Sequence, residues 1–98
     1  MSSEAEIVRS IMRNLNSIDG VFCFRTHGNS FSVRGIPDII GCAKGRFFAI
    51  EAKKSAKNHP SKAQEYILHK LLLSGAKTYV IWDKYPAEVI EWISNLNQ

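Results

Sequence analysis

The chain has 98 residues, of which 45% are hydrophobic and 22% are charged, and its formal net charge is +4. These values are ordinary for a folded globular protein and argue against a disordered chain, so we expect one domain over residues 1–98. No apolar run approaches the roughly 18 residues that a transmembrane helix needs, and the charged N-terminus lacks a signal-peptide pattern. We therefore expect a cytoplasmic protein with no membrane contact, and we leave a phage origin open.

Positive charge is concentrated in the middle of the chain. Residues 20–62 contain eight lysines and arginines against two acids, Asp38 and Glu51, which gives a net charge of +6. Residues 1–19 and 63–98 each have a net charge of −1. A basic block of this kind attracts phosphate backbones, although an ordinary solvated surface explains it equally well.

The first half of the chain predicts a helix and a strand. Residues 4–17 form the helix, whose apolar side chains recur at helical spacing: Ile7, Val8, Ile11 and Leu15. Ser3 and Glu6 have the spacing of a capping box at its start. Asp19-Gly20 ends the helix, residues 21–26 predict a strand, and residues 27–35 predict a polar loop.

The second half predicts a hairpin followed by a helix, a strand and a last helix. Strands over residues 36–43 and 46–54 flank a tight turn at Lys44-Gly45. After a basic loop over residues 55–60, Ser61 caps a helix that ends near Ser74, and residues 77–82 form a fourth strand. Pro86 opens a helix that buries Val89, Ile90, Ile93 and Leu96. The order α-β-β-β-α-β-α predicts an α/β fold with a small mixed sheet flanked by helices.

The predicted hairpin brings two acids together. A two-residue turn pairs Ala43 with Arg46 and, counted outward, Asp38 with Glu51. Directly paired side chains share a face with Cβ atoms about 5 Å apart, where two ionised carboxylates repel by about 3 kcal/mol at an effective dielectric near 20. A positive charge is therefore expected between them.

A divalent cation is the natural candidate, since Mg²⁺ prefers oxygen ligands and takes one or two carboxylates, waters and phosphate oxygens. Lys53 lies two residues beyond Glu51 and points to the same face, where its ammonium can polarise a metal-bound water beside a phosphorus. The alternative is a carboxylate pair neutralised by Lys53 without a metal.

Two segments, Gly35-Ile36-Pro37-Asp38-Ile39-Ile40-Gly41 and Phe48-Ala49-Ile50-Glu51-Ala52-Lys53, resemble the PD-(D/E)XK nuclease signature. In detail they are similar to the VRR-NUC family, and with the N-terminal helix and the later Ser-x-x-Gln helix the resemblance covers nearly the whole chain. It implies a restriction-endonuclease-like αβββαβ core. It also implies an endonuclease that hydrolyses phosphodiester bonds of DNA with Mg²⁺ or Mn²⁺ and without an organic cofactor.

The resemblance assigns roles to individual residues. Asp38 and Glu51 would ligate the metal together with the backbone carbonyl of Ala52, and Lys53 would serve the attacking water.

The family's N-terminal glutamate, which contacts the metal or its waters, matches Glu4 or Glu6. We choose Glu4, because it shares the apolar stripe of the helix whereas Glu6 has the capping-box role, although a first-turn glutamate is also favoured by the helix dipole. Gln64 matches the family's helix glutamine, although Ser61-x-x-Gln64 is itself a capping box.

Six basic residues are candidate nucleic-acid contacts, although ordinary exposed loop and strand-end residues would look the same: Arg25, His27, Arg34, Lys54, Lys57 and Lys62. The chain offers no recognition helix or zinc module, so we expect it to select nucleic-acid shape rather than base sequence. Small family members resemble enzymes that cleave branched DNA such as four-way junctions. Because symmetric cutting needs two sites, we expect a homodimer.

Two other functions stay open at this point. The chain could be a non-catalytic module that binds nucleic acid on a nuclease-like fold, although the presence of Asp38, Glu51 and Lys53 argues against it. It could also be a restriction-like enzyme that reads a duplex sequence. A kinase-like enzyme is excluded, because the chain is too short and has no glycine-rich loop before the strand of Lys53.

Overall fold

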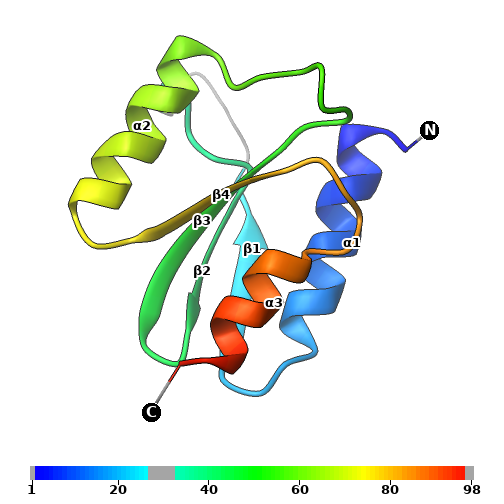
Figure 1. The fold of residues 1–98 in the computed structure, drawn as a ribbon, viewed down its shortest axis with the longest axis vertical. Helices are drawn as coiled ribbons and strands as arrows, with labels where there is room; N and C mark the ends of the chain where they lie inside the picture. The colour runs from blue at the N-terminus through cyan, green and yellow to red at the C-terminus, as the bar shows by residue number, and fades with distance from the viewer. Residues whose placement is uncertain (1, 27–32, 97–98) are drawn as a thin grey trace.

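The computed structural model describes residues 2–26 and 33–96 (Figure 1). These residues form three helices and four strands: α1 Glu4–Asn16, β1 Val21–Arg25, β2 Ile39–Ala43, β3 Arg46–Ala52, α2 Lys62–Leu73, β4 Lys77–Ile81 and α3 Ala87–Ser94. The predicted α/β class and the αβββαβ core are confirmed, and α3 follows that core. None of the described helices is long and apolar enough to cross a bilayer.

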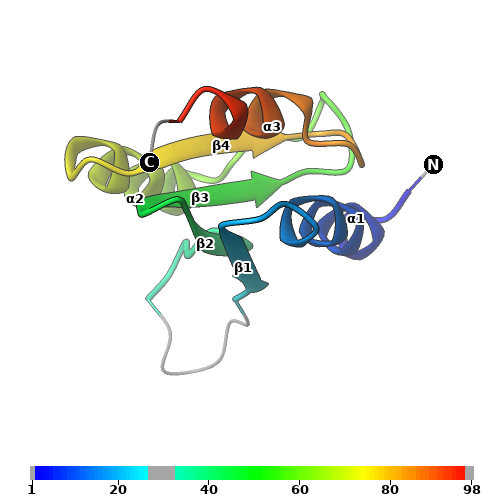
Figure 2. The same cartoon turned by 90° about the horizontal axis from the view of Figure 1, so that it is seen from below.

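The four strands form one mixed sheet in the order β1-β2-β3-β4 (Figure 2). The first three strands pair antiparallel through short connections, whereas β4 runs parallel to β3. A parallel neighbour requires a crossover connection, and α2 supplies it. The crossover places α2 on one side of the sheet, while α1 and α3 lie on the other (Figure 1).

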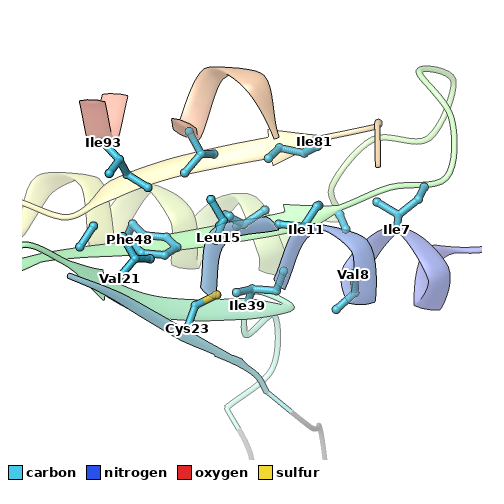
Figure 3. Packing of buried hydrophobic residues seen from close by; sticks show 14 residues of the cluster. Ile7, Val8, Ile11, Leu15, Val21, Cys23, Ile39, Phe48, Ile81 and Ile93 are labelled. Carbon is cyan, nitrogen blue, oxygen red and sulfur yellow. The ribbon is translucent and has the colours of Figure 1, made fainter. Parts of the chain in front are cut away.

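The hydrophobic core lies between the sheet and the two helices α1 and α3 (Figure 3). The stripe predicted for α1 is buried as expected, with Ile7, Val8, Ile11 and Leu15 all at most 2% exposed. Residues of β1 alternate: Val21 and Cys23 are buried and Phe22 and Phe24 are exposed. In α3, Val89 and Ile93 are buried, while Ile90 and, just after the helix, Leu96 pack against the core and are only half-buried.

Two strand ends differ from the prediction, and both differences lie next to the predicted acids. Strand β2 begins at Ile39 rather than at residue 36, and β3 ends at Ala52 rather than at residue 54. Pro37 has no backbone N–H to give to a ladder. The Asp38 side chain accepts from the Ala52 N–H, so a carboxylate replaces a backbone carbonyl there. The other ends differ by one or two residues, within the usual fraying of elements.

Candidate active site

The β2–β3 hairpin fixes the position of Asp38 relative to Glu51. Lys44 and Gly45 both have positive φ, 50° and 85°, which identifies a two-residue turn of the kind that matches strand twist. The observed pairs run from Ala43↔Arg46 to Ile39↔Ile50, and this confirms the predicted register. One step further outward brings Asp38 level with Glu51.

Asp38 is held from both neighbouring strands. Its backbone carbonyl accepts from the Thr26 N–H at 2.9 Å, which continues the pairing with β1. Its side-chain Oδ2 accepts from the Ala52 N–H at 2.8 Å, on the side of β3. These two hydrogen bonds orient the carboxylate beside Glu51 before any ligand arrives.

Glu51 is the one buried charged residue among those that the structure describes, with 1% of its surface exposed. Its burial, and next the charge of Asp38, raise the pKa of Glu51 to about 7, while Lys53 opposes the increase. Its two oxygens have different surroundings. Oε2 lies 3.3 Å from Lys53 Nζ and accepts from Gln64, whereas the buried Oε1 has no hydrogen-bond partner.

Gln64 joins the start of α2 to this carboxylate. Its Nε2 donates to Glu51 Oε2 at 2.6 Å, and its Oε1 accepts from Lys53 Nζ at 3.1 Å. The same Oε1 accepts from the Ser61 N–H at 2.7 Å, which completes the predicted capping box of α2. The two interpretations that the sequence offered for Gln64, helix cap and site residue, therefore hold together in one geometry.

A glycine allows α2 to approach the Pro-Asp segment closely. Gly35 has a φ of +85°, and a Cβ at this position would overlap the backbone carbonyl of Ala63 and lie 2.8 Å from the Gln64 nitrogen. Only a residue without a side chain fits here without displacing the first turn of α2. Gly35 is therefore part of what positions Gln64.

Comparison with solved structures adds an independent observation. The chain is similar to a protein described as a VRR_NUC domain, with a TM-score of 0.74, over 99% of this chain and 100% of the other, at 17% sequence identity. The chain has the VRR_NUC fold. A second similar structure, a VRR_NUC domain protein, has a TM-score of 0.67 and 20% identity over 95% of this chain and 86% of its own. No family model and no curated protein matches the sequence.

The resemblance to VRR-NUC nucleases that the Pro-Asp hairpin indicated is thus confirmed at the level of the fold. A divalent metal belongs to that resemblance, and the residues of this VRR_NUC fold suit one. Two carboxylates face each other, and the buried Oε1 of Glu51 lacks the partner that a buried charged oxygen requires. A hard cation that takes oxygen ligands would satisfy it.

Glu4 lies apart from these two acids. The described part of the chain contains no group of three or more histidine, cysteine or acidic side chains spaced to hold one ion. Glu4 instead lines a surface hollow with Ser2, Ser3, Glu6 and Lys54. Its contact with a metal or its waters stays a prediction, as does ligation by the Ala52 carbonyl.

The predicted nucleic-acid contacts that the structure describes differ in exposure. Arg25 is half-buried at the end of β1, and four others are exposed: Arg34, Lys54, Lys57 and Lys62. His27 lies outside the described residues. Their role in binding stays a prediction.

Proposed function

We propose that this chain is a metal-dependent endonuclease that hydrolyses phosphodiester bonds of DNA. The observation that carries the proposal is the buried Glu51 carboxylate, which has one oxygen held by Lys53 and Gln64 and one oxygen without a partner. A protein that needed only a neutral strand pair would gain nothing from burying this charge beside Asp38, because desolvation of an unpaired charged oxygen costs free energy.

Asp38 and Glu51 would hold Mg²⁺ or Mn²⁺, with the Ala52 carbonyl as a further ligand. The bound ion supplies Lewis-acid activation of water and neutralises charge on the phosphate. Lys53 adds a fixed positive charge at the same place, where negative charge develops on the phosphate oxygens. Gln64 and Glu51 hold the Lys53 ammonium in position, at 3.1 Å and 3.3 Å, so little reorganisation is needed when substrate binds.

The proposed substrate is branched DNA such as a four-way junction. The net charge of +6 over residues 20–62 supports binding to phosphate backbones, which positions a protein on DNA without reading the bases. No base-reading helix is expected from the sequence, so strand geometry rather than base sequence would select the substrate.

We also propose that the protein acts as a homodimer, because two symmetric cuts in a junction need two sites. The apolar sheet face, which we define as Phe22, Phe24, Cys42 and Phe47, supports this proposal. The strand register places Phe22, Cys42 and Phe47 in one row, and the three phenylalanines are 66%, 49% and 43% exposed.

Exposed apolar patches of this kind mark sites of protein association. The apolar sheet face lies on the same side of the sheet as α2 and has no charged member, so a second copy of the same face suits it better than a charged partner does. Pairing through it would bring two carboxylate sites into one complex.

The proposed activity is tested by incubating labelled four-way junction and duplex DNA with the protein in Mg²⁺, Mn²⁺ or EDTA. We expect cleavage of the junction that requires metal and falls by about 100-fold or more in Asp38→Asn, Glu51→Gln and Lys53→Met. Asp38→Asn keeps an oxygen for the Ala52 N–H, so it removes charge with little change of structure. Asp19→Asn and Lys70→Met, at exposed positions elsewhere, serve as matched controls.

Binding without metal-dependent products would show that the fold serves as a non-catalytic module. Cleavage of duplex at one base sequence would instead show a restriction-like enzyme. Full cleavage by folded Asp38→Asn or Lys53→Met would contradict the assignment of these residues.

A further inference from the structure

Three cations surround one hollow outside the carboxylate site. Arg9 and Arg13 of α1 and Lys84 of the segment between β4 and α3 line this hollow of about 200 Å³, together with Glu6 and Ser10. The sequence did not point to it, because residues 1–19 have a net charge of −1 and Lys84 is far from them along the chain. We call these three cations and their hollow the α1 basic hollow.

The position of Lys84 over α1 is fixed by hydrogen bonds. Ser10 Oγ, which lies between the two arginines in sequence, donates to the Lys84 carbonyl at 2.9 Å. The Lys84 N–H donates to Asp83 Oδ1, also at 2.9 Å. Both backbone groups of Lys84 are therefore occupied, and its side chain starts from a defined point beside the arginines.

The positive charges of the α1 basic hollow are only partly balanced by the protein, since the pKa of Glu6 is lowered first by its hydrogen bonds with Ser3 and then by the charges of Lys84 and Arg9. Three cations against the single acid Glu6 leave a net charge of +2, and Glu6 is engaged with the Ser3 N–H in the capping box of α1. Within residues 2–26 and 33–96, the one ion pair joins Lys53 to Glu51, and neither the two arginines nor Lys84 takes part in it. Arg9 and Arg13 are also four residues apart on a helix, where like charges repel.

The hollow continues toward the reaction centre. Lys84 lines a second hollow with Lys54, together with Ser2, Ile7, Trp82 and Asp83. Lys54 directly follows Lys53, which contacts Glu51. Positive side chains thus follow one another from the carboxylate site along α1 to Arg13 in its last turn, with Asp83 as an acid among them.

We propose that the α1 basic hollow binds a phosphate of the nucleic-acid backbone and holds the substrate at a distance from the phosphate that is cut. Arginine binds phosphate oxygens with two parallel N–H donors, and such contacts set the register of a protein on DNA. Because this ligand is part of the DNA substrate proposed above, the inference rests on the proposed function. The contact itself concerns binding and needs no cleavage.

The test is the affinity of fluorescently labelled four-way junction DNA in EDTA, measured by anisotropy over a series of salt concentrations. Arg9→Gln/Arg13→Gln is compared with Lys70→Gln/Lys77→Gln, which removes the same charge from exposed positions elsewhere. We expect the arginine pair to weaken binding roughly tenfold and to lower the salt slope of log Kd by about 0.9, since the hollow holds one phosphate and each neutralised phosphate contributes about 0.9. Lys84→Gln should lower the slope by about half as much, and the control pair should change the affinity less than twofold.

Equal weakening by the two double variants would overturn the proposal, because it would reduce the effect to the overall field of the protein. Unchanged binding by the arginine variant would do the same. Polyglutamate of matched charge is a further competitor. If the wild-type protein bound it as tightly as junction DNA and the arginine double variant lost this affinity, the result would contradict a phosphodiester ligand.

Cleavage of the same junction DNA by the wild-type protein in Mg²⁺, set beside these affinities, separates this inference from the proposed function. If the wild-type protein never cleaves DNA but the arginine pair still weakens binding selectively, the hollow stands and the nuclease assignment fails. If the wild-type protein cleaves DNA with metal but the arginine double variant binds DNA as tightly as the wild type, the nuclease assignment stands and the hollow fails.

Discussion

Gln64 Nε2 donates to Glu51 Oε2 at 2.6 Å, while Gln64 Oε1 accepts from both Lys53 Nζ and the Ser61 N–H. One side chain thereby completes the capping box of α2 and contacts both ends of the Glu51–Lys53 ion pair. The start of α2 and the geometry of the carboxylate site are coupled through this residue.

Gln64→Ala should lower the rate of DNA cleavage about tenfold or more, because Lys53 loses an acceptor and Glu51 loses a donor. Ser61→Ala is the matched control: it removes the hydroxyl cap and costs about 1 kcal/mol of stability, yet leaves Gln64 in contact with Glu51. Cleavage rates at saturating metal and urea unfolding curves measure both effects. Equal losses of cleavage in two folded variants would mean that Gln64 acts through the helix start alone.

The metal-free protein should lose stability as pH rises. Burial and Asp38 raise the pKa of Glu51 from 4.5 to about 7, so the folded state binds this proton more tightly than the unfolded chain does. The stabilising contribution of this group is complete below about pH 4.5 and is lost as pH rises through 7. The loss amounts to about 3 kcal/mol in the unfolding free energy.

Glu51→Gln should remove this pH dependence, and Mg²⁺ or Mn²⁺ should raise the melting temperature of the wild-type protein more at pH 8 than at pH 5. The rise in melting temperature is larger at pH 8 because the metal binds the ionised carboxylate. Calorimetry at the two pH values, with and without metal, measures both. The same pH slope in the wild-type protein and Glu51→Gln would contradict the role of this group.

Gly35→Ala should destabilise the protein by about 2 kcal/mol or more and should also reduce cleavage. The added Cβ would overlap the Ala63 carbonyl and displace the first turn of α2, which carries Gln64. Gly45→Ala is the control, since Gly45 has the same φ of +85° but open space around its Cβ position. Its cost should be about 1 kcal/mol from backbone strain, with cleavage retained. Equal effects of Gly35→Ala and Gly45→Ala on stability and cleavage would contradict the role of Gly35 in packing against Ala63.

Phe22→Asp and Phe47→Asp should convert a dimer into a monomer, because they place charges in the apolar sheet face. Tyr85→Asp, at another exposed aromatic residue, should leave the assembly intact. Sedimentation equilibrium over a range of concentrations measures the mass. A monomer at all concentrations would exclude the homodimer.

Cys42 provides a second measure of the same contact. It is exposed within the apolar sheet face, whereas Cys23 is buried and its pKa is raised to about 11 by burial. A short bismaleimide should therefore cross-link two wild-type chains and should fail with Cys42→Ser. Cross-linking that survives Phe47→Asp would place the contact elsewhere.

Local patterns were sufficient for several parts of this molecule. The Lys44-Gly45 turn fixes which residues of the hairpin pair, so the register that brings Asp38 level with Glu51 could be counted from the sequence. The two capping boxes are also local, because their partners lie three residues apart. The exact start of β2 was missed, since the contact between the Asp38 side chain and the Ala52 N–H is not visible as a pattern.

The order of elements, the stripe of α1 and the hairpin follow from local patterns, because periodicity and turn chemistry act over a few residues. Three contacts became visible only in the folded molecule: Gln64 reaches Glu51 and Lys53, Gly35 lies against Ala63, and Lys84 joins Arg9 and Arg13. These contacts depend on how α2 and the segment before α3 pack against the rest of the fold. Such packing is the sum of many apolar contacts between residues far apart in the chain, so no local spacing encodes it.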